Sequence, residues 1–207
     1  SHEEDRIERG MRRLCEQKEM SLFRWRSTDG LRQDGSDQAL LDTRDPINAL
    51  ARLGEDLRKP AVFLFEDLHP HMDDPRLRRA LRDQVDILGK RGQIIVIVAP
   101  SLNIPAELEK DIIVLDVPLP SAEEAARLLD VLTQSQSIKM EPELREAFVR
   151  TSLGLCEREI KRAFAHILAT GGRFEAEDLK TLASLKKQAL RKTRFLDYQE
   201  DIPPMTN

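Results

Sequence analysis

Three short apolar runs dominate the first 120 residues of the chain, at residues 61–65, 94–99 and 112–115. None of them alternates polar with apolar residues. A strand that is apolar on both faces must be covered on both faces, which is typical of a parallel sheet wrapped by helices. The segment between the first two runs has the length of a crossover helix that joins neighbouring parallel strands. The sequence therefore predicts an α/β fold with a sheet at its centre.

Caps and helical spacing predict the other elements of this first half. We expect a helix over residues 1–19, a strand over 20–27, a loop over 28–43, and helices that begin at Asp45-Pro46 and Asp74-Pro75. Aspartate before proline is a favoured helix start, because the carboxylate accepts from free amides while proline needs no amide partner. Ser1 and Glu4 fit the Ser-x-x-Glu capping box.

Past Pro118 and Pro120 the pattern contains helices only, which predicts a small all-α lid domain after the sheet. The predicted boundaries are residues 1–118 for the α/β domain and 119–197 for the helical domain. Residues 198–207 contain two prolines and are predicted to be a linker.

Composition limits the classes of partner. The chain has 207 residues, a net charge of −4 and only 4% aromatic residues, which disfavours a general grip on nucleic acid or on an anionic membrane. Cys15 and Cys156 belong to no metal-ligand spacing, so we interpret them as reduced thiols. No apolar run approaches the roughly 20 residues of a membrane span, and no signal peptide is evident. We therefore expect a cytoplasmic protein with no membrane partner.

Two acids, Glu66 and Asp67, come directly after the first apolar run. A strand that ends in two acids, then a helix, a second strand and a helical domain together resemble the AAA+ ATPase module of the P-loop NTPase type. In that module the first acid orients Mg²⁺ and the second activates the attacking water. Here the order is Glu-Asp instead of Asp-Glu, so the longer side chain would crowd the metal and the shorter one would fall short of the water. The alternative is that the two acids only end the strand and cap the next segment of the chain.

The phosphate-binding sequence of such modules is absent from these 207 residues. Binding of a triphosphate requires the motif G-x-x-x-x-G-K-[ST]. The only Gly-Lys pair in the sequence, Gly89-Lys90, does not have the spacing of that motif. Ser101 stands where the module usually has a water-polarising asparagine, and Glu109-Lys110 stand where a trans-acting arginine is expected. We therefore predict no catalytic, cofactor-binding or metal-binding residues in this chain, and no ATP hydrolysis. Glu66 and Asp67 remain a degenerate Walker B-like pair, and Ser101 an altered sensor position.

Two alternatives from other functional classes stay open. His69 and His71 lie among Asp67, Asp73 and Asp74, which is compatible with a metal-dependent hydrolase, although nothing downstream offers a second half of a site. A cluster of arginines could contact the phosphates of nucleic acid, as an adaptor module would, although acids lie between them. These arginines are Arg76, Arg78, Arg79 and Arg82.

Several segments resemble one family, the hypothetical chloroplast-reading-frame AAA ATPases of cyanobacteria, other bacteria and plastid genomes. The resemblance covers most of residues 3–200, and its most specific part is Ser-Leu-Asn-Ile-Pro-Ala-Glu-Leu-Glu at residues 101–109. The segments that carry it are residues 62–70, 82–83, 98–110, 116–120, 154–164 and 186–192.

The resemblance implies a degenerate amino-terminal AAA-like domain, followed in the full-length protein by a second AAA domain that binds ATP and Mg²⁺. This chain matches the first domain, and the strand that the family carries before the first helix is missing from it. The implied partners are the protein's own downstream AAA domain and further copies in a hexamer-type ring. We therefore expect a three-layer AAA+-like fold without a phosphate loop, with a regulatory or assembly role.

Overall fold

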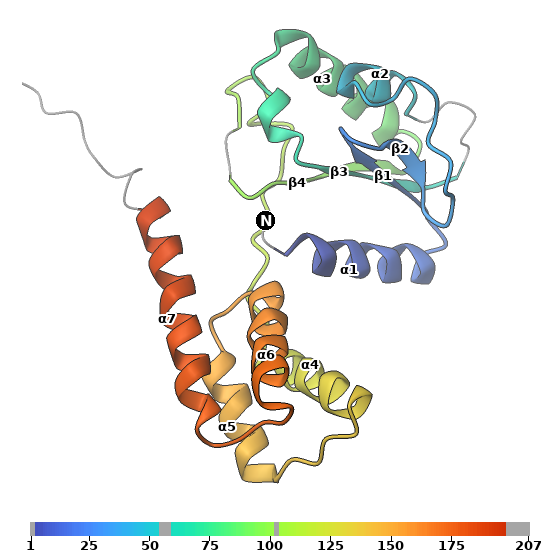
Figure 1. The fold of residues 1–207 in the computed structure, drawn as a ribbon. Helices are drawn as coiled ribbons and strands as arrows, with labels where there is room; N and C mark the ends of the chain where they lie inside the picture. The colour runs from blue at the N-terminus through green and yellow to red at the C-terminus, as the bar shows by residue number, and fades with distance from the viewer. Residues whose placement is uncertain (1–2, 54–58, 102–103, 198–207) are drawn as a thin grey trace, which may run out of the picture. The chain divides into compact units, whose positions relative to one another are not determined.

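The computed structural model describes residues 3–53, 59–101 and 104–197 (Figure 1). The chain divides into two compact units, Ser1–Asp116 and Val117–Asn207. The predicted linker at 198–207 lies outside the described residues.

A four-stranded sheet forms the centre of the first unit. Its strands are β1 (Ser21–Arg26), β2 (Gly30–Gln33), β3 (Ala61–Glu66) and β4 (Gln93–Val98), in the spatial order β2-β1-β3-β4. β3 and β4 are parallel, as their apolar character predicts; β1 is also parallel to β3, and β2 pairs antiparallel with β1. The loop predicted over residues 28–43 is therefore wrong in part, because it contains β2. Only Gly30 and Leu31 of β2 are buried, so the strand lacks the apolar run that marks the others.

Helices cover both faces of this sheet and give it three layers (Figure 1). Helix α1 (Glu4–Gln17) covers one face, where Ile7 and Met11 pack with Val62, Leu64 and Val98. The opposite face is covered by α2 (Pro46–Ala51), the short 3₁₀ helix η1 (His69–His71) and α3 (Pro75–Gly89). Its core contains Trp25, Phe63, Phe65 and Leu77, all of which are buried. The three-layer α/β fold expected from the sequence is confirmed.

The helix starts agree with the aspartate caps. Asp45 accepts from the amides of Ile47 and Asn48, and Asp74 accepts from the amide of Arg76. The capping box predicted at Ser1 and Glu4 is not the start of α1. The N-cap of α1 is Glu3, and Ser1 lies outside the described residues.

The third apolar run does not form the predicted strand. Residues 112–115 have no regular structure, and Ile113 and Leu115 are 87% and 81% exposed. A strand needs a neighbour that satisfies its backbone groups. Among the described residues, β4 is the last strand of the sheet and no strand pairs with residues 112–115. The prediction was wrong because β-propensity alone does not supply that neighbour.

The second unit is entirely helical in its described part, as expected. It consists of α4 (Ala122–Ser135), α5 (Pro142–Ser152), α6 (Glu157–Gly171) and α7 (Asp178–Asp197). Phe148, Phe164 and Phe174 meet edge to face in its core. Ser121 and Glu124 form a complete capping box at the start of α4. No helix among the described residues has the length and apolar character to cross a membrane.

Candidate functional site

The carboxyl ends of the three parallel strands bring the candidate residues to one edge of the sheet. Glu66 is the last residue of β3 and lies opposite Val98, the last residue of β4. The amide of Asp67 donates to the carbonyl of Val98 over 2.9 Å, so Asp67 begins where the sheet ends. On the other side of β3, β1 runs in register with Trp25 opposite Phe65, which places Arg26 beside Glu66.

Glu66 is buried and already paired. Its side chain is 4% exposed, and Arg26 donates through Nε to its Oε2. Side chains alternate between the two faces of a strand, so Glu66 shares the α1 face with Val62 and Leu64. The carboxylate therefore lies on the face that α1 covers, where it forms an ion pair with Arg26 of β1.

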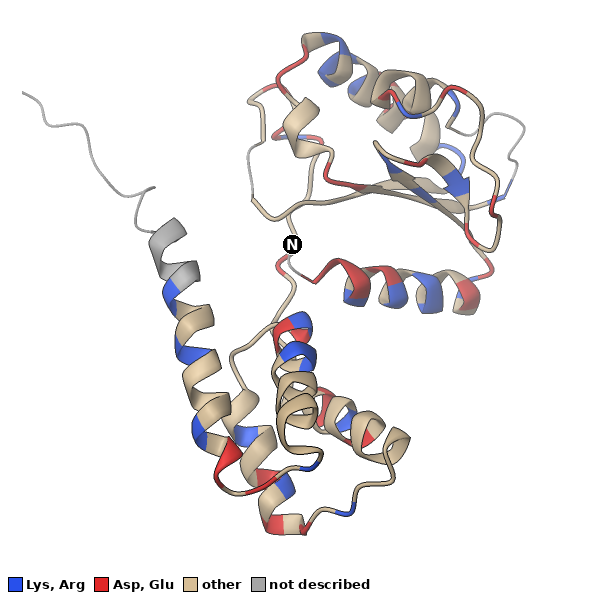
Figure 2. Cartoon of the chain, in the orientation of Figure 1, with Lys and Arg blue, Asp and Glu red and all other residues tan. Residues whose placement is uncertain are grey.

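Glu8 of α1 extends this pair into a network. Its Oε1 accepts from Arg24 over 2.6 Å and from Arg12 over 2.8 Å, and its Oε2 lies 3.8 Å from Arg26. Acidic and basic residues are interleaved along α1 (Figure 2). The network thus connects α1, β1 and the end of β3 through alternating charges.

Burial dominates the electrostatics of Glu66. Desolvation raises the pKa of Glu66, and the hydrogen bond from Arg26 opposes this rise only in part. Its second oxygen, Oε1, has no hydrogen-bond partner among the described residues. Burying a carboxylate with one unsatisfied oxygen costs free energy. The end of β3 therefore holds a buried carboxyl group whose pKa Arg26 keeps below the value that burial alone would give.

Asp67 has the opposite environment. Its side chain is 57% exposed, and its φ of +53° lies in the left-handed region that aspartate tolerates better than most residues. Its Oδ1 lies 3.7 Å from Nδ1 of His69. The two neighbouring acids are therefore not brought together at one point.

The other predicted positions lie in the segment that follows β4. Ser101 is exposed and lies three residues beyond the end of β4, while Glu109 and Lys110 are exposed on the following loop. The two histidines also diverge, because the ring of His71 packs edge-on against Trp25 at a centroid distance of 6.0 Å. In the part of the chain that the structure describes, no three His, Cys, Asp or Glu side chains are placed to hold a metal ion.

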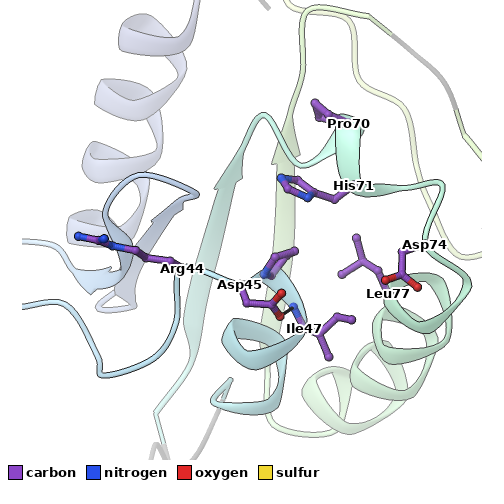
Figure 3. A pocket seen from close by; sticks show the side chains of 8 residues that line it. Arg44, Asp45, Ile47, Pro70, His71, Asp74 and Leu77 are labelled. Carbon is purple, nitrogen blue, oxygen red and sulfur yellow. Dashed lines mark hydrogen bonds between the residues drawn. The ribbon is translucent and has the colours of Figure 1, made fainter.

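A cavity of about 350 Å³ lies between the starts of α2 and α3 (Figure 3). Sequence reasoning did not find it, although the two Asp-Pro helix starts mark its walls. Its polar lining includes Asp45 and Asp74, and Ile47 and Leu77 make it partly apolar. Both carboxylates already accept from helix amides, and Asp74 also accepts from the Arg76 side chain over 2.8 Å. These acids are therefore occupied by their capping role.

The arginines of α3 face acid partners. Arg78 and Arg82 lie 3.6 Å from Glu107 and Asp111 of the loop after β4. The other two pair within or beside the helix, Arg76 with Asp74 and Arg79 with Asp83. Local acids thus neutralise the surface that nucleic-acid phosphates would need.

An α/β unit with an acid pair at the end of a central strand, followed by a helical unit, is the architecture of AAA-type ATPase domains. The chain belongs to the SpoVK-like AAA ATPase family: residues 1–117 match the model of its N-terminal domain, and residues 123–193 match that of its second domain.

The comparison proteins include three called "Uncharacterized AAA domain-containing protein ycf46". The chain is 31% identical to the protein from Trieres chinensis over 95% of its length, and 25% identical to those from Guillardia theta and Pyropia yezoensis over 100% and 96%. It spans only 40%, 41% and 40% of the length of these relatives.

Among solved structures, the AAA domain of FIGL-1 in complex with ADP is similar, with a TM-score of 0.48 and 11% identity. The match covers 77% of this chain and 64% of that one.

Proposed function

We propose that this chain is a catalytically inactive AAA-like domain with a regulatory or assembly role in a larger AAA+ ATPase. The observation that carries the proposal is the burial of Glu66 and its pairing with Arg26. An acid that orients Mg²⁺ must offer its oxygens to the metal and its waters. Here one oxygen is taken by a guanidinium, and the side chain is 4% exposed.

The phosphate side of the site supports the same proposal. The 207 residues contain no G-x-x-x-x-G-K-[ST], so this chain has no glycine-rich loop and lysine to hold a triphosphate. Ser101 and Glu109-Lys110 replace the two further polar positions of an active module. The residues of this chain therefore do not fit Mg-ATP, and no hydrolytic step is assigned to them.

The larger protein would supply the active site and the ring. Since the chain spans about two fifths of its relatives' length, a further AAA domain outside these residues would bind ATP and Mg²⁺. AAA modules act in rings, so we propose that further copies of the chain and the downstream domain are its partners.

Calorimetric titration of Mg-ATP and Mg-ADP into the chain tests its inactivity. We expect no saturable heat. Saturable binding that Asp67→Asn abolishes would overturn the proposal, and Asp83→Asn on the exposed face of α3 is the matched control, because it removes the same charge away from the candidate site.

A second experiment tests the regulatory or assembly role in the longer protein. Removing residues 1–197 should leave nucleotide binding intact and change the ATP turnover rate or the mass of the oligomer. If neither the turnover rate nor the oligomer mass changes, this domain has no such role.

A further inference from the structure

Helix α7 carries charges of one sign along most of its length. Between Asp178 and Asp197 its sequence contains six lysines and arginines and no acid, although the chain as a whole has a net charge of −4. The six are Lys180, Lys186, Lys187, Arg191, Lys192 and Arg194. In Figure 2 the described part of this helix is blue and tan beyond its first turn. The helix is therefore a basic element in an acidic chain.

Local acids do not neutralise the outer side of α7. Lys180, Lys187 and Arg191 are exposed, and none of them forms an ion pair within the part of the chain that the structure describes. The helix dipole favours cations only in the last turn, and α7 ends at Asp197, so the dipole does not explain these three. The ion pairs of the helical unit hold other cations, which are Arg127, Arg145, Lys161 and Arg173.

An apolar line runs beside these cations. Ala183 and Leu190 are exposed, Leu190 to 42%. They are seven residues apart, which places them on one side of the helix about two turns apart. Lys180 and Lys187 have the same spacing, and Lys187 neighbours both apolar residues because it is four residues after one and three before the other. The opposite side of the helix, with Leu182, is buried in the core of the unit. The outer side of α7 thus has an apolar line and a basic line that the fold does not use.

Three kinds of polyanion would pair with the cations, and the apolar line distinguishes them. An amphipathic helix that binds a membrane buries its apolar face in the lipid, but the main apolar face of α7, with Leu182, is already buried in protein. A nucleic-acid phosphate backbone would match Lys187 and leave Leu190 without an apolar contact. An acidic amphipathic helix matches both, because its apolar side faces Leu190 while its flanking carboxylates face the cations.

We propose that the outer side of α7 binds an acidic amphipathic helix of a partner protein. The surface extends from Lys180 to Arg191, which are 11 residues apart and therefore about 17 Å apart along the helix. About three turns of a partner helix cover that length. The inference goes beyond the proposed function, since it does not depend on whether the domain binds nucleotide.

Fluorescence anisotropy with labelled peptides tests the proposal on the 207-residue chain. The probe is a peptide of about 18 residues, or five helical turns, with leucines along one side and glutamates on both sides of them. We expect saturable binding with a Kd of about 100 µM or tighter. A peptide of the same composition in scrambled order should bind at least about tenfold more weakly, because it has no apolar side. Equal binding of the scrambled peptide, or no saturable binding of the probe, would overturn the proposal.

Single substitutions locate the surface. Lys187→Glu and Leu190→Ser should each weaken binding of the probe about fivefold, the first through charge and the second through lost apolar contact. The matched controls are Lys139→Glu and Val131→Ser, which change exposed residues of the helical unit outside α7 and should leave the affinity unchanged. All four residues are exposed, so Tm should stay within about 3 °C of the parent. Controls that weaken binding as much as the α7 variants would contradict the proposal.

A double-stranded nucleic acid is the competing occupant of this surface. Tighter binding of a duplex of about 20 base pairs than of the peptide, weakened by Lys187→Glu and unaffected by Leu190→Ser, would overturn the proposal. Titration with Mg-ATP is a separate measurement. Saturable nucleotide binding would refute the proposed inactivity and leave the peptide-binding result unchanged.

Discussion

Breaking the ion pair between Arg26 and Glu66 tests how much this pair stabilises the first unit. Arg26→Met keeps much of the side-chain length of Arg26 and removes its charge. It leaves Glu66, 4% exposed, as a buried carboxylate with no strong donor. Removing one partner of a buried ion pair costs about 3–5 kcal/mol. Arg26 is 36% exposed, so solvent screening reduces our expectation to about 2–3 kcal/mol at pH 7. For a unit of this size that is a fall in Tm of about 10 °C.

The pH dependence of this loss depends on the pKa of Glu66. Burial raises the pKa of Glu66 in the folded protein, so between its ordinary and its raised pKa the folded state binds more protons than the unfolded state. The free energy of unfolding therefore falls as pH rises through that window. Without Arg26 the pKa of Glu66 rises further, and protonation relieves more of the cost. The destabilisation by Arg26→Met should then be smaller at pH 5 than at pH 7.

Urea unfolding monitored by tryptophan fluorescence measures this change in one unit. Trp25 is the only tryptophan, is fully buried in β1, and donates from Nε1 to the carbonyl of Thr43. Its emission therefore reports the unfolding of the first unit. Glu66→Gln is the companion variant, because in Arg26→Met/Glu66→Gln no buried charge remains and most of the loss should disappear.

Two results would refute this reasoning. One is a loss below about 0.5 kcal/mol at pH 7, the usual range of surface substitutions. The other is a double variant as unstable as the sum of the two single variants. Arg79→Met is the matched control, because Arg79 is 70% exposed in its pair with Asp83 and its loss should matter little.

Three further predictions concern the two cores and a surface pair. Phe164→Ala should cost about 3–5 kcal/mol, because this fully buried ring packs in the aromatic cluster of the second unit; calorimetry should show one transition lowered while the tryptophan signal is unchanged. Gly30→Ala should cost about 1–3 kcal/mol, because Gly30 has a φ of +80° and an added Cβ would lie 2.8 Å from Oγ1 of Thr43; urea midpoints measure it. The Arg145 hydrogen bonds to Asp130, at 2.6 and 2.7 Å, lower the pKa of Asp130. Arg145→Ala should therefore cost about 0.5–1 kcal/mol at pH 7, and urea unfolding should show this cost vanish as pH falls through that lowered pKa.

The sequence predicts those parts of the fold that local chemistry decides. β3 is apolar at nearly every position, and burial on both faces explains that pattern, whereas β4 is equally apolar but fully buried only at Gln93 and Val98. The aspartate caps at Asp45 and Asp74 are equally local, since each cap needs only its own helix amides. The sequence did not predict β2, because Arg32 and Gln33 give it no apolar pattern. Its pairing with β1 depends on the turn at Gly30.

The partner of Glu66 depends on strand register, and local patterns do not give register. Arg26 is 40 residues away in the chain, and it becomes a neighbour only because β1 and β3 align Trp25 with Phe65. An arginine at the end of a predicted strand was the available signal. That arginine can be identified as the partner of Glu66 only once its strand is known to lie beside the strand that ends in Glu66.

The difference between Glu66 and Asp67 arises from where the strand stops. Consecutive residues of a strand point to opposite faces, so two adjacent acids share one site only if the backbone turns between them. Here the backbone does turn, since Asp67 has a φ of +53°, but the turn directs Asp67 into solvent after Glu66 has pointed toward α1. Arg26, Arg24 and Glu8 then hold Glu66 under the helix. Changing the order at residues 66 and 67 from Glu-Asp to Asp-Glu would therefore not by itself create a metal site, because the side chain at position 66 would still face the arginines of β1.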